Sequence, residues 1–308
     1  MPPRPPEPAV VDAVIVTWNS GPDLPACLAA LPSFVRPIVV DNGSADGGVA
    51  VARSAGSDVI ALGRNRGFPA AVNVGLERVT SAFTLLLNPD VVVGTGAVER
   101  CLDVLAGDAS IGLVGPNTVD SDGHPEPPAA RRDRRAGYIL LESLALTRLH
   151  PWFDRQTICD RGHDRDVDAV NGAFMLVRTD LLRSLGGLDE TVFMYLEDAD
   201  LCRRVRDAGF RVRFVAGASA VHAGATSTSR GDTGAQARAY LHRLDADIEF
   251  LRRYGRRGEA GLGVAAFLLR SVVGLVVSTR MKDRRQRYAS ALRWTWSQRR
   301  GRTGPPAV

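Results

Sequence analysis

Residues 10–19 read VVDAVIVTWN, and this stretch decides the fold. Residues 10–17 are mostly β-branched or otherwise apolar and show no helical period, which predicts a buried strand. A strand that is apolar on both faces is typical of a parallel sheet with helices on both sides. Trp18 and Asn19 end the strand, and residues 23–31 have the pattern of a short helix.

The same alternation of strand and helix continues along the chain. Further strands are predicted over 36–41, 59–62, 83–87, 111–115 and 210–215, and helices over 47–55, 70–79, 97–106 and 179–185. Strands and helices alternating at this spacing predict an α/β, doubly wound fold with a mostly parallel central sheet. Residues 167–178 are strand-like apart from Asn171 and Gly172. Residues 120–137 hold three prolines and four arginines and are predicted to form a mobile loop.

Polar clusters follow three of these strands, at residues 17–19, 41–44 and 88–90. In open α/β sheets the binding crevice lies beyond the carboxyl ends of the strands. Turns also need Asn, Asp and Gly, so one cluster alone says little. Three clusters in register favour a binding crevice over simple turns.

Four side chains in this crevice have suitable chemistry, each with an ordinary alternative. Asp41 can accept hydrogen bonds from a nucleobase or ribose, or cap its own turn. Asp90 can hold a hard divalent ion, because Mg²⁺ often takes one or two protein carboxylates plus phosphate oxygens, although one Asp is a weak metal signal. Arg64 and Asn65 fit a phosphate or a base edge, and equally fit a solvated loop.

The densest acidic cluster is Glu197, Asp198 and Asp200, at the start of a predicted basic helix. Acidic residues in a first turn complement the helix dipole. Met194 and Tyr195 before them suggest a partly apolar setting, which can raise the pKa of a carboxylate toward general-base duty. His222 follows a predicted strand and is either a metal or phosphate ligand or a structural histidine.

Taken together, these segments resemble the inverting glycosyltransferases of family 2, which have the GT-A fold. The resemblance extends from about residue 11 to residue 232. It is carried, in order, by VTWN (16–19), VDNGS (40–44), NRGFPAAVNVG (65–75), NPDV (88–91), NGAFMLVR (171–178), GGLDETVFMYLEDADLCRR (186–204) and HAGATST (222–228). MYLEDADL and the His-then-Ser/Thr run are most similar to rhamnosyltransferases, including actinobacterial enzymes that act on polyprenyl-diphosphate-linked N-acetylglucosamine.

The resemblance implies a role for each matching position. Asp198 would be the catalytic base, and Asp90 and His222 would hold Mg²⁺ or Mn²⁺. The donor-binding positions would be Thr17, Asn19, Asp41, Asn42, Ser44, Arg64, Asn65, Gly67, Asn73 and Asn88. The acceptor-side positions would be Asn171, Gly172, Glu197, Asp200 and Arg204. Asn88 stands where the family's DxD motif has its first acid, so we expect weaker binding of free metal than at a full DxD site.

The implied activity is transfer of a sugar from a nucleotide-sugar donor, with L-rhamnose from dTDP-L-rhamnose as the first choice. The implied acceptor is a lipid-linked or polysaccharide glycan in cell-envelope synthesis. The alternatives are a UDP-sugar-dependent transferase of the same family and a non-catalytic nucleotide- or glycan-binding module. An NAD-dependent oxidoreductase is excluded because no GxGxxG follows the first strand. The sequence leaves the donor, the acceptor and the oligomeric state open.

Charge is unevenly distributed. The chain has 39 basic and 34 acidic residues, but residues 252–308 carry a net +12 and residues 1–251 a net −7. Residues 236–254 read as an amphipathic helix, and residues 260–279 are about long enough to span a bilayer. Arg270 at the centre of that segment disfavours a span. We expect the segment to lie on an anionic membrane surface or to pack on the body, and no groove-reading motif indicates nucleic acid.

The predicted organisation has three parts. A disordered Pro-rich leader (1–9) precedes a GT-A domain (10–235) and a basic helical tail (236–308); the domain divides into a nucleotide-sugar half (10–115) and an acceptor half (116–235). The leader lacks the apolar run of a secretory signal. Scattered cysteines without a CxxC pair fit a reducing compartment: Cys27, Cys101, Cys159 and Cys202. We therefore expect a cytoplasmic protein, peripheral on the inner face of the cell membrane.

Overall fold

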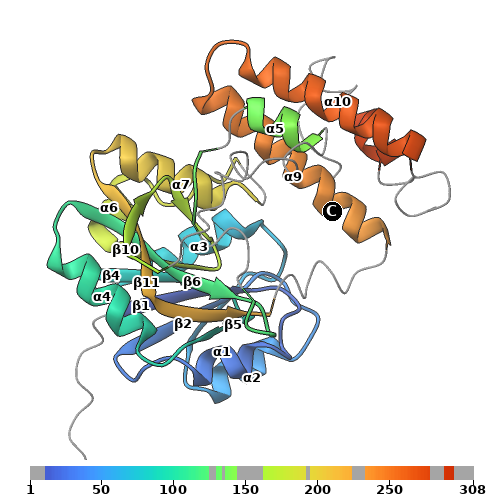
Figure 1. The fold of residues 1–308 in the computed structure, drawn as a ribbon. Helices are drawn as coiled ribbons and strands as arrows, with labels where there is room; N and C mark the ends of the chain where they lie inside the picture. Colours follow the sequence, from blue (N-terminus) through green and yellow to red (C-terminus); the bar gives the residue numbers. More distant parts are fainter. Residues whose placement is uncertain are drawn as a thin grey trace, which may run out of the picture. The chain divides into compact units, whose positions relative to one another are not determined.

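A nine-stranded sheet forms the core of the larger part of the chain (Figure 1). The structure is a computed structural model and describes residues 11–124, 130–133, 136–143, 162–191, 195–223, 233–277 and 288–294. The predicted leader, residues 224–232 and the basic residues 280–287 lie outside the described residues.

The predicted strands are present, and the structure adds short strands that the sequence did not indicate. In chain order the strands are β1 Val11–Thr17, β2 Val35–Asp41, β3 Asp58–Ala61, β4 Phe83–Leu87, β5 Val91–Val93, β6 Ile111–Val119, β7 Ala130–Arg131, β8 Arg165–Val167, β9 Ala169–Val170, β10 Phe174–Arg178 and β11 Arg211–His222.

The main sheet has the order β3-β2-β1-β4-β10-β6-β11-β5, with β8 beside β11. β1 pairs in parallel with β2 and β4, β2 with β3, and β6 with β11. β10 runs antiparallel between β4 and β6, and β11 runs antiparallel to β5 and β8. The predicted α/β class is confirmed, with the antiparallel strands confined to the second half of the sheet.

Helices cover both faces of this sheet. They are α1 Leu24–Ala29, α2 Gly48–Ser54, α3 Phe68–Leu76, α4 Ala97–Gly107, α6 Thr179–Ser184 and α7 Glu197–Asp207. Side chains of α1 and α4 join odd-numbered positions of β1 (Val11, Ala13, Ile15) in one buried apolar cluster. α3 packs on the opposite face, where Gly75 approaches Val14 and Val40. Such two-sided burial is what the continuous apolar runs require.

Four elements differ from the sequence-based expectation. β6 and β11 continue four and seven residues beyond their predicted ends at 115 and 215, because the two strands pair with each other past a bulge between Val215 and Ser219. The predicted loop 120–137 contains β7, which pairs with β9, and the start of α5 Ala136–Ser143. Pairing with a distant strand leaves no periodic signal in a two-residue segment, so β7 was missed.

The chain divides into two compact units. The first is Met1–Arg131, Asp160–Phe193 and Glu197–Thr226, and it contains the main sheet. The second is Arg132–Cys159, Met194–Leu196 and Ser227–Val308. Within the second unit α5 lies with α9 Thr233–Tyr254 and α10 Glu259–Val277, as Figure 1 shows. α5 was not foreseen as a partner of the predicted tail helices.

Candidate active site

The strand ends of the first unit bring most of the predicted site residues to one edge of the sheet. β1, β2, β4 and β6 are oriented alike, and β10 is antiparallel to β4 and β6. The carboxyl ends of these parallel strands therefore meet the amino end of β10 at a single edge, which we call the carboxyl edge. The segments at this edge are those after Thr17, Asp41 and Leu87 and before Phe174.

The loops after β1 and β2 are bonded to each other. The Asn19 backbone N–H donates to Ser44 Oγ at 3.0 Å, and the Ala45 N–H donates to Asn19 Oδ1 at 2.8 Å. Asn19 has a φ of 54°, a left-handed conformation that Asn tolerates better than most residues. The Asp41 carboxylate accepts the Ser44 N–H at 3.2 Å, so it caps its own turn as the ordinary alternative predicted. These contacts preform the loops and do not themselves test a donor-binding role.

Asn42 holds the loop after β3 against the loop after β2. Its Nδ2 donates to Asn65 Oδ1 at 3.1 Å and to the Gly67 carbonyl at 3.2 Å. Its Oδ1 accepts the Arg66 N–H at 2.8 Å. A Cβ on Gly43, which has a φ of +82°, would lie 2.7 Å from the Arg64 backbone. We call this connection between the two loops the Asn42 brace.

Two groups in this region have hydrogen-bonding capacity to spare. The Thr17 hydroxyl is buried and has no hydrogen-bond partner among the described residues. A buried hydroxyl without a partner costs free energy unless a ligand or water satisfies it. Arg64 has an exposed side chain at the mouth of the loops. Both fit the predicted donor pocket.

The Asn88–Asp90 turn lies beside the amino end of β10. The Asn88 N–H donates to the Ala173 carbonyl at 3.0 Å, which extends the β4–β10 pairing by one residue. The Cys27 thiol donates to the Asn88 carbonyl at 3.5 Å. Burial raises the pKa of Cys27 to about 12, so the thiol stays protonated and supports the turn rather than acting as a nucleophile.

Asp90 and His222, both predicted metal ligands, are brought together by strand pairing. β5 and β11 are antiparallel with His222 opposite Val91, and the Ala223 N–H donates to the Asp90 carbonyl at 3.0 Å. His222 Nε2 lies 3.3 Å from Asp90 Oδ1. Their side chains are 12% and 11% exposed, so the pair is partly buried but reachable. One carboxylate and one imidazole fit a divalent ion whose remaining ligands come from phosphate and water.

A second cluster, Asp120, Asp122 and His124, has ligand atoms within 4.8 Å of one another. It has the literal DxD spacing, and sequence reasoning passed over it. Asp120 Oδ1 accepts the backbone N–H groups of Asp122 and His124 at 3.0 and 2.8 Å. These bonds are those of an ordinary Asx-turn, which forms without a metal ion. The side chains of Asp120 and His124 are also 45% and 76% exposed. The Asp90–His222 pair is the better metal candidate.

Asp198 lies at the start of α7, against the amino end of β10. Its Oδ2 accepts the Gly172 N–H at 3.2 Å, and its Oδ1 accepts the Ala199 N–H at 2.6 Å. A Cβ on Gly172 would come 3.0 Å from Asp198 Cβ, so a larger residue there would push the acid away from β10. Arg131 Nη2 lies 2.6 Å from Asp198 Oδ1. The predicted apolar setting is therefore wrong: the carboxylate is held by a cation and two backbone N–H groups.

Arg131 is the residue that sequence reasoning missed. It lies among four arginines of the predicted loop, and nothing in the local pattern singles it out. The β7–β9 pairing places it opposite Ala169, two residues before Asn171. Asn171 itself donates from Nδ2 to Thr118 Oγ1 at 3.3 Å, which fastens the same corner to β6.

The other acceptor-side candidates divide between the surface and the interior. Glu197 begins α7 and is partly exposed. Asp200 is 1% exposed and pairs with Arg204 at 2.7 Å. Arg204 also donates to the carbonyls of Leu185 and Gly187, both at 3.0 Å. In this structure Asp200 and Arg204 anchor α7 to the end of α6, so their contact with an acceptor stays a prediction without support here.

Asn73 has a similar structural use. Its Nδ2 donates to the Leu188 carbonyl at 2.8 Å and to Glu190 Oε1 at 2.9 Å, and its Oδ1 accepts the Leu188 N–H at 2.8 Å. The amide thus connects α3 to the loop after α6. Both N–H groups of the amide are used within the fold, so the donor contact of Asn73 stays a prediction.

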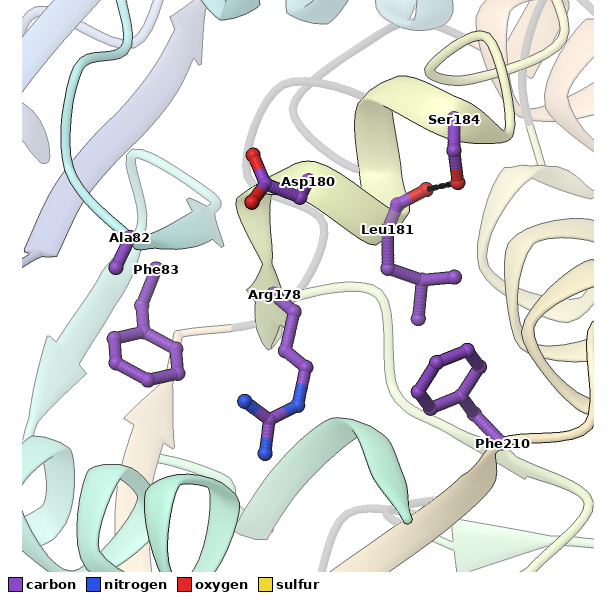
Figure 2. A pocket seen from close by; sticks show the side chains of 7 residues that line it. All are labelled: Ala82, Phe83, Arg178, Asp180, Leu181, Ser184 and Phe210. Atoms are coloured by element: carbon purple, nitrogen blue, oxygen red, sulfur yellow. Dashed lines mark hydrogen bonds between the residues drawn. The ribbon is translucent and has the colours of Figure 1, made fainter. Parts of the chain in front are cut away.

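A hollow of about 460 Å³ lies at the opposite edge of the sheet (Figure 2). Phe83, Arg178 and Phe210 are among the side chains around it (Figure 2). The Arg178 guanidinium is occupied, donating to the carbonyls of Ile111 and Asp108 at 2.8 and 3.0 Å. Its place at the amino end of β4 separates it from Asp90 and Asp198, so we do not assign it to the active site.

Comparisons with known proteins identify the fold and the family. The chain is 32% identical over 242 residues to the N-acetylglucosaminyl-diphospho-decaprenol L-rhamnosyltransferase of Mycobacterium tuberculosis, covering 72% of this chain and 78% of that protein. The solved mannosyltransferase PcManGT of Pyrobaculum calidifontis, in complex with GDP-Man and Mn²⁺, superposes with a TM-score of 0.55 at 15% identity, over 95% of this chain and 87% of its own. The solved structure of S. aureus TarS residues 1–349 superposes with a TM-score of 0.52 at 14% identity. The match covers 95% of this chain and 92% of the TarS chain.

The fold and the loops at the carboxyl edge define a GT-A glycosyltransferase. The profile of the glycosyltransferase-like family 2 matches residues 8–242. The chain belongs to this family and is a glycosyltransferase.

Proposed function

We propose that this glycosyltransferase transfers L-rhamnose from dTDP-L-rhamnose to polyprenyl-diphosphate-linked N-acetylglucosamine, with inversion at the sugar. The observation that carries the proposal is the position of Asp198. Its Oδ2 lies at the Gly172 N–H, next to the Ala173 carbonyl that binds the Asn88–Asp90 turn. A carboxylate is thus held beside the candidate donor crevice. The name of the mycobacterial relative supports the choice of sugar and acceptor.

Inverting transfer needs one base on the acceptor side and none on the donor side. Asp198 Oδ2 would take the proton of the acceptor hydroxyl while that oxygen bonds to the anomeric carbon. The bond between the anomeric carbon and the diphosphate oxygen breaks in the same step, and the nucleoside diphosphate leaves with its electron pair. The Asn42 brace would hold the nucleotide, and alignment of the two substrates contributes much of the rate.

Asp90 and His222 would hold the divalent ion. Mg²⁺ or Mn²⁺ supplies charge neutralisation for the departing diphosphate. The neutral Asn88 leaves Asp90 as the one acid of this turn, so the ion depends on the donor's own phosphates. We expect ion and donor to bind together.

The proposed acceptor carries a lipid, so the proposal includes an anionic membrane surface as partner and a position on the cytoplasmic face of the cell membrane. A UDP-sugar donor is the alternative for the same site. A non-catalytic binding module is not favoured, because the described chain keeps Asp90 and Asp198 in reachable positions with 11% and 14% side-chain exposure.

The test is a transfer assay with the purified full-length protein and a short-chain polyprenyl-diphosphate N-acetylglucosamine. We expect mass spectrometry to show addition of one deoxyhexose from dTDP-L-rhamnose with Mg²⁺ or Mn²⁺, and no product with EDTA. In parallel, dTDP-L-rhamnose with Mg²⁺ should raise the melting temperature, because a ligand of the native state stabilises it.

Three outcomes would contradict parts of the proposal. If product forms only from UDP-sugars, the donor is a UDP-sugar and not dTDP-L-rhamnose. Equal rates with EDTA and with Mg²⁺ would remove the metal role from Asp90 and His222. No product and no thermal shift across dTDP- and UDP-sugars would favour the binding-module alternative.

A further inference from the structure

The Arg131–Asp198 pair has a geometry that goes beyond a simple ion pair. Asp198 Oδ1 accepts the Ala199 N–H at 2.6 Å and forms an ion pair with Arg131 Nη2 at 2.6 Å. Asp198 Oδ2 receives the Gly172 N–H alone, at the longer distance of 3.2 Å. Among the described residues the two carboxylate oxygens are therefore unequal. Oδ1 is anchored, and Oδ2 keeps capacity to accept another hydrogen bond.

The same short ribbon supplies both contacts. β7 carries Arg131, and β9 leads into Asn171 and Gly172. The Asp168 N–H donates to the Arg131 carbonyl at 3.1 Å, which locks the ribbon at this point. Arg131 and Asp198 are only 19% and 14% exposed. A partly buried ion pair is screened less by water and salt than one at the surface, so this pair can fix the rotamer of the acid.

We propose that Arg131 is the positioning residue of the catalytic base: it anchors Oδ1 and so presents Oδ2 to the acceptor hydroxyl. This inference rests on the proposed role of Asp198. Arg131 touches neither the donor nor the reacting atoms in this scheme. Its effect is on the rate of the transfer step and not on donor binding.

The experiment compares Arg131→Gln and Arg131→Lys with wild type, using Arg132→Gln as the matched control. Arg132 is the next residue, and its side chain is exposed. We expect kcat of Arg131→Gln to fall about 100-fold, as for a misplaced catalytic group. The donor KM and the donor-induced thermal shift should stay within about twofold of wild type. Arg131→Lys should recover part of kcat, and Arg132→Gln should match wild type.

The inference is overturned if Arg131→Gln keeps the wild-type kcat, or if its loss of kcat is matched by loss of the thermal shift, as expected for a purely structural pair. It is also overturned if Arg132→Gln is equally impaired. Failure of the proposed function looks different: the wild-type chain itself then transfers no sugar, and both proposals fall.

A separate observation concerns α10 in the second unit. Exposed large apolar side chains gather on this helix: Leu262, Leu269, Val272, Val273 and Val276, at 41–69% exposure. Their spacing keeps them on one side of the helix. The segment Glu259–Val276 has a mean hydropathy of 1.7 and is long and apolar enough to cross a bilayer.

The opposite side of α10 is used within the unit. Ala266 and Phe267 are 1% exposed and pack with Ile139 of α5, Leu244 of α9 and Trp294. The Arg270 guanidinium lies 5.9 Å from the centre of the Tyr240 ring on α9. A spanning helix would have to expose Arg270 to lipid or carry its partners with it, and burying a charge at the bilayer centre is costly.

We infer that α10 lies in the plane of an anionic membrane interface, with its exposed apolar side in the lipid and its other side on α5 and α9. Charge complementarity supports lipid over a second copy of the chain. The sequence after α10 continues with Arg280, Lys282, Arg284, Arg285 and Arg287, within a segment of net charge +12. Two like-charged segments repel each other, whereas phosphatidylglycerol attracts them.

The test is sedimentation of the full-length protein with vesicles of equal parts phosphatidylglycerol and phosphatidylethanolamine. We expect the double substitution Val272→Glu/Val276→Glu to lower the membrane-bound partition at least about tenfold. The control Ser54→Glu/Ala55→Glu adds the same charge at two exposed positions at the end of α2 and should bind like wild type. Alkaline carbonate should release the wild-type protein from the vesicles.

Unchanged binding of the α10 variant overturns this inference, and resistance to carbonate shows a spanning helix instead. A wild-type dimer that the variant converts to a monomer, without vesicle binding by either, shows that a second copy covers the face. Transfer to a water-soluble acceptor analogue separates this test from the proposed function, because the α10 variant should transfer sugar to it at the wild-type rate.

Discussion

Asp198→Asn is expected to abolish sugar transfer, with a loss of about 100- to 10,000-fold in kcat, the range that general-base catalysis contributes. Asn has nearly the same size as Asp and preserves the close approach to Gly172. It cannot take the acceptor proton. The donor site does not include Asp198 in the proposed scheme, so the donor-induced rise in melting temperature should persist. Single-turnover transfer and thermal shift measure the two effects.

Glu197→Gln is the matched control for this substitution. Glu197 is the adjacent acid, in the same first turn of α7, and is partly exposed. We expect kcat of Glu197→Gln to change by less than about tenfold, because Glu197 does not take the acceptor proton in the proposed scheme. Full activity of Asp198→Asn, or an equal loss in both variants, would remove Asp198 from the base role.

Asp12→Ala is expected to cause the largest loss of stability. Asp12 is fully buried at the start of the β1 region and binds Arg36 through both oxygens, at 2.7 and 2.9 Å. It also accepts the N–H groups of Thr80 and Ser81 at 2.6 and 2.9 Å. The Arg36 side chain is 38% exposed, so water can solvate it once Asp12 is gone. The expected loss comes from the hydrogen bonds that the buried carboxylate accepts, and it is about 1.5–3 kcal/mol. Urea unfolding followed by circular dichroism should show this loss.

Asp58→Ala is the control for Asp12→Ala. Asp58 lies 3.9 Å from Arg78, and these side chains are 33% and 61% exposed. Exposed pairs contribute about 0–1 kcal/mol, so the control should unfold near the wild-type midpoint. Equal midpoints for the two variants would mean that the Asp12 pair does not stabilise the sheet.

The stability from Asp12 has a defined pH dependence. Burial would raise the pKa of this carboxyl, but the Arg36 guanidinium and the N–H groups of Thr80 and Ser81 outweigh burial and hold the pKa below its usual 3.8. A depressed folded-state pKa contributes stability above the unfolded value and loses it as pH falls through the folded value. The difference between wild type and Asp12→Ala should therefore shrink below about pH 4.

Local patterns predicted most of the sheet but not its distant pairings. The β1, β2 and β4 runs are long and apolar, so their type and order followed from period and turn residues. β7 is two residues long and exists through its pairing with β9. Ala130 pairs with Val170, 40 residues away, and Arg131 with Ala169, 38 residues away. No window of sequence contains that information.

The candidate site shows the same limit. Asp90, His222, Asp198 and Gly172 were named from motifs, and the structure brings Asp90 to His222 and Asp198 to Gly172. The roles of Asn73, Asp200 and Arg204 were assigned by position in those motifs, and the structure shows bonds within the fold at each. Polar residues in one motif serve either the ligand or the fold, and spacing alone does not distinguish the two uses.

The Asn42 brace limits which loop residues can be varied to change the donor preference of this enzyme. Asn42 and Gly43 form the Asn42 brace, so most variants of a library that randomises them would lose the conformation of the two loops. Arg64 and Arg66 have exposed side chains in the same loops, and replacing these side chains removes no hydrogen bond of the Asn42 brace. Directed evolution toward another nucleotide sugar should therefore vary these two arginines and keep Asn42 and Gly43.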